Sequence, residues 1–184
     1  MKTASKINFV KVGNGRLALY HRPRNEDFHS LREMGCTHII TLLKESEGAE
    51  QYGTMTRNAG LEWVWISVPN GKYPEKDVHE RLIHAMPQLS QLLDDGKSIL
   101  IHCSAGIHRT GTVAYGLLRW RGIESKQAMK IIARTRQETA EGMMEKRMRW
   151  GDENARQPIE QELPWIHSIK EFVNHWRMKL SRSH

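Results

Sequence analysis

The sequence has few cysteines, few prolines and no long apolar run, and each shortage excludes a class of protein. Two cysteines among 184 residues are too few for the disulfide framework of a small secreted scaffold. Six prolines and 14 glycines, without a repeat or a low-complexity tract, exclude a collagen-like or linker-rich chain. No segment reaches the roughly 18 consecutive apolar residues of a membrane span, and the first residues lack the apolar stretch of a signal peptide. We therefore expect a folded, soluble, cytoplasmic protein.

The charge balance indicates an anionic substrate or partner. The chain has 28 Lys and Arg against 21 Asp and Glu, so its formal net charge is +7 at pH 7, and such a charge attracts anions over a long range. The charge does not identify the anion: nucleic acid, phosphoprotein, inositol phosphates and nucleotides all remain open. The length and the 39% hydrophobic content are typical of one soluble domain, so we expect residues 1–184 to form a single domain.

Hydrophobic periodicity predicts an alternation of strands and helices over the first two thirds of the chain. Apolar runs bounded by turn residues predict strands at Leu17–Tyr20, His38–Leu43, Trp63–Val68 and Ser98–His102. Helical periodicity predicts helices at Asn25–Met34, Ala49–Ala59, Glu75–Asp95, Thr110–Arg121, Ser125–Arg134, Ala140–Arg149 and Ile159–Leu180. This order favours an α/β fold with a central, mostly parallel sheet of about four to five strands flanked by helices. The last third is expected to be helical.

The segment after the fourth predicted strand is suited to bind phosphate. The predicted strand ends at His102 and is followed directly by Cys103, and ligands collect at the carboxyl ends of strands in open α/β sheets. From Ser104 to Arg109 the backbone can aim successive N–H groups at one point, next to the positive end of the following helix. The same donors stabilise a thiolate. Gly106 frees the tight loop from Cβ clashes, and Arg109 offers a planar fork to two phosphoryl oxygens.

The pattern Cys103-x5-Arg109, with His102 before it and Thr110-Gly111 after it, resembles the signature loop of the cysteine-based protein tyrosine phosphatase superfamily, closest to the dual-specificity branch. The resemblance implies a phosphatase (Cys-x5-Arg) fold that hydrolyses phosphate esters through a cysteinyl-phosphate intermediate, without a metal or another cofactor. It implies that Cys103 is the nucleophile, Arg109 the clamp on the phosphoryl group, Thr110 an aid to departure of the thiolate, and His102 a residue that tunes the thiol. The phosphate-binding residues would be Ser104, Ala105, Gly106, Ile107, His108 and Arg109. A weaker resemblance to bacterial members covers Tyr20–Pro23, Leu31–Gly35 and Thr41–Leu43.

The position of the general acid departs from this family pattern. Family members place an Asp on the loop after the preceding strand, where it protonates the leaving group, and Asn70 occupies that place here. An amide cannot donate a proton as an acid does, and three readings remain open. Asp77 or Glu75 supplies the acid from a shifted loop, Asp152 or Glu153 supplies it from the helical part, or no strong acid is needed because the leaving group is itself a phosphate.

The third reading has support from a second resemblance. The run from His108 to Gly111, together with Lys72 at the substrate rim and Pro74, resembles atypical plant and fungal dual-specificity phosphatases that act on inositol pyrophosphates. Cysteine-type RNA 5′-triphosphatases are another anhydride-cleaving precedent. His108 is either an exposed loop residue or a recognition residue at the substrate entrance.

The partner expected from the sequence is a phosphorylated anion: a phosphoprotein, an inositol phosphate or a nucleotide. A membrane partner is not expected, and nucleic acid is possible but not favoured, since aromatic residues at nucleic-acid spacing are not evident. A phosphate-binding pseudophosphatase is the alternative from another class. The presence of both Cys103 and Thr110 argues against it, because binding alone needs neither side chain.

Overall fold

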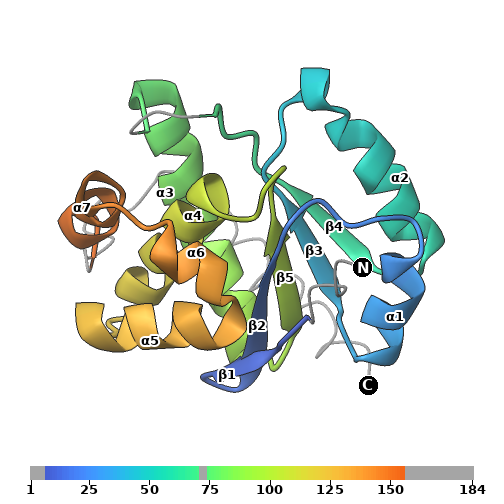
Figure 1. The fold of residues 1–184 in the computed structure, drawn as a ribbon, viewed down its shortest axis with the longest axis horizontal. Coiled ribbons are helices and arrows are strands. Elements are labelled where there is room, and N and C mark those ends of the chain that lie inside the picture. The colour runs from blue at the N-terminus through green and yellow to red at the C-terminus, as the bar shows by residue number, and fades with distance from the viewer. Residues whose placement is uncertain (1–6, 71–73, 156–184) are drawn as a thin grey trace, which may run out of the picture.

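The computed structural model describes residues 7–70 and 74–155 and shows a five-stranded sheet with helices on both faces (Figure 1). The strands are β1 (Val10–Val12), β2 (Gly15–Tyr20), β3 (His38–Thr41), β4 (Glu62–Trp65) and β5 (Ser98–His102). The helices are α1 (Asp27–Glu33), α2 (Ala49–Asn58), α3 (Lys76–Asp94), α4 (His108–Trp120), α5 (Ser125–Thr135), α6 (Gln137–Glu141) and α7 (Glu145–Glu153), with a 3₁₀ turn η1 (Glu45–Glu47).

The sheet has the strand order β1-β2-β5-β3-β4, with β5 at its centre. Only β1 pairs antiparallel, with β2, and the other three pairings among the described strands are parallel. His102, the last residue of β5, lies in register with Tyr20 on one side and Thr41 on the other. Since parallel strands point the same way, the chain leaves β5 at an edge that the carboxyl ends of β2 and β3 share.

Each face of the sheet is covered by its own apolar core. On one side, α1 and α2 pack with residues such as Phe28 and Leu31. On the other side, α3, α4, α5 and α7 contribute a larger core that includes Leu82, Leu117 and Trp150. Strand β5 is buried along its whole length, as expected for a central parallel strand covered on both faces. The strand that carries the loop is therefore held rigidly from both sides.

Helix α7 is fixed on α4 by polar bonds as well as by the buried Trp150. The Tyr115 hydroxyl donates to the Asp152 carboxylate over 2.8 Å, and the Arg119 Nε donates to the same oxygen over 2.7 Å. The Trp150 indole N–H donates to His79 Nδ1 on α3 over 3.2 Å. These bonds give α7 a defined position beside the helix that begins at the loop.

The α/β fold with a mostly parallel sheet is confirmed, and apart from small shifts of the element ends the main differences are at three places. Strand β1 was not predicted, because three residues are too few to show a period. The predicted helix Ala140–Arg149 is instead the end of α6 and most of α7, with a turn at residues 142–144. The predicted strand Trp63–Val68 ends at Trp65, although backbone bonds to the β3 side continue as far as Val68.

Two predictions are not tested by the residues that the structure describes. The predicted helix Ile159–Leu180 lies outside the described residues, and the single domain over 1–184 stays a prediction. Both cysteines, Cys36 and Cys103, are free and buried. None of the helices in the two described ranges is long and apolar enough to cross a membrane.

Candidate functional site

The loop from Cys103 to Ile107 turns its backbone carbonyls away from its centre. The carbonyl of Ser104 accepts the Arg22 backbone N–H over 3.1 Å. The carbonyls of Ala105 and Gly106 accept the Arg136 Nη1 over 2.8 and 2.7 Å. Three successive carbonyls are thus bonded outward, an arrangement that suits a loop whose N–H groups bind an anion.

Gly106 is required by the conformation of this loop. Its φ is +69°, in the left-handed region that residues with a side chain rarely adopt, and a Cβ there would collide with the backbone carbonyl of Tyr20 on β2. The Gly106 N–H donates to the Cys103 Sγ over 3.2 Å. The glycine thus lets one loop amide reach the sulfur while its carbonyl bonds outward.

The Cys103 thiol is buried, with 3% of the residue exposed, and it is nevertheless acidified. Burial alone raises the pKa of the thiol, but the Thr110 hydroxyl and amide, the Arg109 charge and the Gly106 N–H together hold this pKa below its usual value of 9.0. The Thr110 hydroxyl is itself buried and bonds to no other group in the described part of the chain. The sulfur is therefore placed where a thiolate is favoured.

His102 is fully buried beneath the loop. Burial lowers the pKa of its imidazole to about 3, so the ring is neutral at ordinary pH. Its Nε2 shares a hydrogen bond of 2.9 Å with the Thr41 hydroxyl at the end of β3. His102 thus tethers the base of the loop to the neighbouring strand without adding a charge, and its predicted influence on the thiol stays a prediction.

Arg109 is buried in the first turn of α4, with 4% of the residue exposed. Its Nη1 donates to the backbone carbonyls of Leu42 and Val68 over 3.3 and 3.2 Å, and its Nη2 donates to the Ser104 hydroxyl over 3.0 Å. These bonds join the segments that follow β3 and β4 to the loop after β5. The guanidinium is therefore oriented before any ligand arrives, which limits the reorganisation needed to bind one.

Glu47 is a residue of this site that the sequence reasoning missed, as is Arg136. Its two carboxylate oxygens accept from Nη1 and Nη2 of Arg109 over 2.7 and 2.9 Å, and one of them also accepts from the Ser104 hydroxyl. The bond to Arg109 lowers the pKa of the carboxyl to about 2. The available signal was its position just after β3, because the carboxyl end of β3 lies beside that of β5.

We expect Glu47→Gln to lower kcat/KM for an aryl phosphate about tenfold. An amide offers one acceptor oxygen instead of two, so one charge-assisted bond that orients Arg109 is lost. The acid limb of the pH–rate profile should not move, because the carboxyl, with a pKa of about 2, is already ionised there. Steady-state kinetics from acid to neutral pH measures both quantities. Glu45→Gln, an exposed residue of the same turn, is the matched control, and an equal loss in both variants would contradict a role for Glu47.

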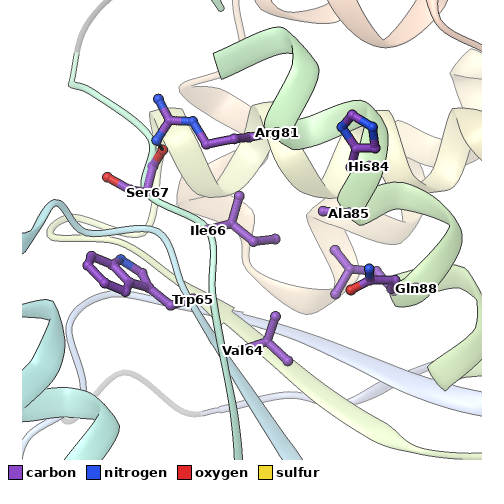
Figure 2. Close-up of a pocket in the computed structure, with 9 residues that line it drawn as sticks. Val64, Trp65, Ile66, Ser67, Arg81, His84, Ala85 and Gln88 are labelled. Carbon is purple, nitrogen blue, oxygen red and sulfur yellow. Dashed lines mark hydrogen bonds between the residues drawn. The ribbon is translucent and has the colours of Figure 1, made fainter. Parts of the chain in front are cut away.

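The structure gives the candidate general acids unequal surroundings. Asn70 is exposed on the segment after β4, and Lys72 lies outside the described residues. Asp77, in the first turn of α3, pairs with Arg81 over 2.6 Å. Arg81 also donates to the Ser67 carbonyl over 2.7 Å, and Figure 2 shows its side chain reaching from α3 toward that residue. The Asp77 carboxylate is therefore paired with a cation in this structure, and its role as the general acid stays a prediction.

The other acid candidates lie on α7 and at the start of α3. Asp152 accepts from Tyr115 and Arg119 and ties α7 to α4, which gives it a packing function. Glu153 is the last residue of α7, and Glu75 directly precedes α3. Among residues 7–70 and 74–155, no three His, Cys, Asp or Glu side chains gather as they would around a metal ion.

A pocket of about 430 Å³ lies between α3 and the segment from Val64 to Ser67 (Figure 2). Its lining includes Ile66, His84 and Leu89, and it contains neither Cys103 nor Arg109. The pocket adjoins β4, which is an edge strand of the sheet. It is therefore distinct from the loop that carries the candidate chemistry.

Comparison with known proteins agrees with the geometry. The profile of a family described as PTP-SAK, Swiss Army Knife protein, DSP-PTPase phosphatase domain, matches residues 6–162. A dual specificity protein phosphatase 12 from Homo sapiens is 28% identical over 89 residues, which are 48% of this chain and 24% of that protein. The match thus spans about a quarter of that relative.

Solved structures of similar fold include phosphatases. A kinase associated phosphatase superposes with a TM-score of 0.65 at 18% identity, over 86% of this chain and all of the other. The structure of PTPMT1 in complex with PI(5)P superposes with a TM-score of 0.63 at 15% identity, over 80% of this chain and 94% of the other. At these identities the superpositions show that the fold is shared.

Proposed function

Because the chain belongs to the PTP-SAK family of dual-specificity-type protein tyrosine phosphatase domains, we propose that it is a phosphatase that uses Cys103 as nucleophile and hydrolyses phosphate esters. The observation that carries the proposal is the acidified, buried thiol inside a loop whose carbonyls are bonded outward. A phosphate-binding module alone has no use for a nucleophile with a lowered pKa. The substrate would be a phosphorylated anion, in keeping with the net charge of +7.

In the proposed first step, the Cys103 thiolate attacks the phosphorus atom. A P–S bond forms as the P–O bond to the leaving group breaks, and the electron pair of that bond goes to the leaving oxygen. The loop N–H groups and the Arg109 guanidinium bind the three remaining oxygens, whose charge is spread in the transition state. Glu47 and backbone carbonyls hold the Arg109 guanidinium beside the loop, and the Nη2 bonds to Glu47 and Ser104 would be exchanged for bonds to phosphoryl oxygens.

In the proposed second step, water attacks the cysteinyl-phosphate, a P–O bond forms and the P–S bond breaks. The Cys103 sulfur leaves as a thiolate, which the Thr110 hydroxyl and the Gly106 N–H stabilise as they do in the free protein. The Thr110 hydroxyl has no other partner in the described part of the chain, so it is available for this task. Free phosphate then leaves the loop and the thiolate is regenerated.

A phosphoanhydride hydrolase is the second candidate, because neither Asp77 nor Asp152 is evidently placed to protonate a leaving group. Asn70 stands in the usual acid position, Asp77 is paired with Arg81, and Asp152 is bound to Arg119. A phosphate leaving group needs less help from an acid than an alkoxide or a phenolate does. An inositol pyrophosphate or a 5′-triphosphate RNA would be a substrate of this kind.

We expect a burst of 4-nitrophenol, equal to the enzyme concentration, when 4-nitrophenyl phosphate is mixed with the protein below the pH at which the second step is fast. Covalent catalysis predicts this burst, and rapid acid quenching should leave phosphate on Cys103, as peptide mass spectrometry would show. Neither a burst nor a phosphorylated Cys103 is expected of a pseudophosphatase.

The leaving group can then be tested by comparing kcat/KM for a phosphotyrosine peptide, a phosphoserine peptide, an inositol pyrophosphate and a 5′-triphosphate RNA. If Asp77 is the acid, Asp77→Asn should slow the two peptides about 100-fold and the anhydrides far less. Equal effects on all four substrates would remove Asp77 from that role. Asp95→Asn, at the other end of α3, is the control for the loss of a charge.

A further inference from the structure

Two arginines are buried in the described part of the chain, and they differ in their partners. Arg109 is 4% exposed and bonds to Glu47 and to backbone carbonyls. Arg147, on α7, is 8% exposed, and its Nε has no hydrogen-bond partner among the described residues. Burying a guanidinium without an anion is costly. The position of Arg147 therefore indicates an anion that binds there.

The beginning of α7 is packed against the phosphate-binding loop. A Cβ on Gly142, in the turn before α7, would collide with the side chain of Ile107 in the loop. In the same turn, the Met143 sulfur would lie 2.5 Å from a Cβ on Gly111 in the first turn of α4. Arg147 follows within the first turn of α7, where its N–H donates to the Met144 carbonyl over 2.8 Å. The fold thus carries Arg147 to the side of the loop.

The charges of Arg147 and of its neighbours act on one another and on the nucleophile, in keeping with the packing of α7 against the loop. Burial is the main cause that lowers the pKa of His108, and the charges of Arg147 and Lys146 lower it further. Burial also lowers the pKa of Arg147 itself, and the negative charge that opposes this shift is that of Cys103. His108 and Lys146 are exposed, and the effect of the Arg147 and Lys146 charges on His108 places the three basic groups near one another.

We propose that Arg147, with Lys146 and His108 at its rim, is a second anion subsite that holds a further phosphoryl group of the substrate. The proposal rests on the proposed function, since the scissile phosphoryl group would occupy the loop from Ser104 to Arg109. The guanidinium of Arg147 offers a planar fork that matches two phosphoryl oxygens, and Lys146 adds a point charge. The substrate class is a small molecule with two phosphoryl groups close together, as a diphosphate or as neighbouring phosphate esters.

The test compares two probes that are not hydrolysed, inorganic phosphate and methylenediphosphonate. We expect calorimetric titration of the full chain to give a Kd for the diphosphonate about tenfold or more below that for phosphate. Arg147→Gln should bring this preference to about twofold, and Arg147→Lys should restore part of it, because Lys keeps the charge without the fork. Arg149→Gln, an exposed residue of the same helix, removes the same charge and should keep the full preference.

A purely structural Arg147 would give different results. Since its Nε has no partner in the described part of the chain, Arg147→Gln should keep or raise Tm, whereas loss of a structural bond would lower Tm. A lower Tm, or a diphosphonate preference that survives in Arg147→Gln, would overturn the subsite. If wild type gives a burst with 4-nitrophenyl phosphate but does not prefer methylenediphosphonate over phosphate, the subsite alone is overturned. Absence of the burst would overturn the proposed function instead, because the titrations do not depend on turnover.

Discussion

Cys103→Ser is expected to reduce kcat for any phosphate ester by at least about 10⁴-fold, which corresponds to about 5.5 kcal/mol of activation free energy. The surroundings of Cys103 lower the pKa of a thiol, but a serine hydroxyl starts so much higher that it stays protonated and is a poor nucleophile. The bonds that hold the loop carbonyls outward and the bond of Arg109 to the Leu42 carbonyl do not involve the sulfur. Phosphate should therefore still bind, with a Kd within about threefold of wild type.

The measurement pairs steady-state kinetics with calorimetric titration of phosphate. Cys36→Ser is the matched control, because Cys36 is also buried and free but burial raises the pKa of its thiol to about 12. This control should keep turnover. Activity that survives in Cys103→Ser would contradict a covalent mechanism through this residue.

The stability difference between wild type and Cys103→Ser is expected to depend on pH. The folded pKa of Cys103 lies below its unfolded value, so its ionisation stabilises the fold above the unfolded pKa, and this contribution is lost as the pH falls through the folded pKa. Cys103→Ser lacks that contribution. We expect the Tm of wild type minus the Tm of Cys103→Ser to decrease as the pH is lowered through this window.

Arg109→Lys is expected to lower kcat about 10³-fold, a loss of the size found when a donor to a developing anion is removed. Lysine keeps the positive charge, but it cannot present two parallel N–H groups to a phosphoryl group. It also cannot reach both Glu47 oxygens together with the carbonyls of Leu42 and Val68, as the guanidinium does. The loss should fall on kcat more than on KM, because the fork is most complementary to the transition state.

Arg121→Lys is the control for this prediction. Arg121 is at the other end of α4, where it bonds to Ser90 and Asp94, so the same exchange there should leave kcat unchanged. Thermal melting should accompany the kinetics, since Arg109 joins three segments of the chain. A kcat near the wild-type value in a folded Arg109→Lys protein would show that the planar fork is not required.

The sequence by itself determined the parts of this protein that depend on local pattern. Alternating apolar runs and helical periods specified four of the five described strands and the α/β order, because the burial of each element leaves its period in the sequence. The run from His102 to Gly111 identified the loop, since Cys103, Gly106 and Arg109 act through a spacing that is itself local. The family match over residues 6–162 agrees with that reading.

Only the tertiary structure decided which distant groups complete the site. Glu47 meets Arg109 across 62 positions of sequence, and Arg136 holds the loop carbonyls from 30 and 31 positions away. The position of Glu47 just after β3 was a weak signal, and nothing in the local pattern distinguishes Arg136 from a solvent-exposed charged residue. Arg147 lay within the predicted helix Ala140–Arg149, and only the packing of α7 beside α4 shows that the side chain is buried and that its Nε has no hydrogen-bond partner among the described residues. The physical reason is that a charged side chain takes its function from the groups that surround it in space, and the folding of the sheet brings those groups together.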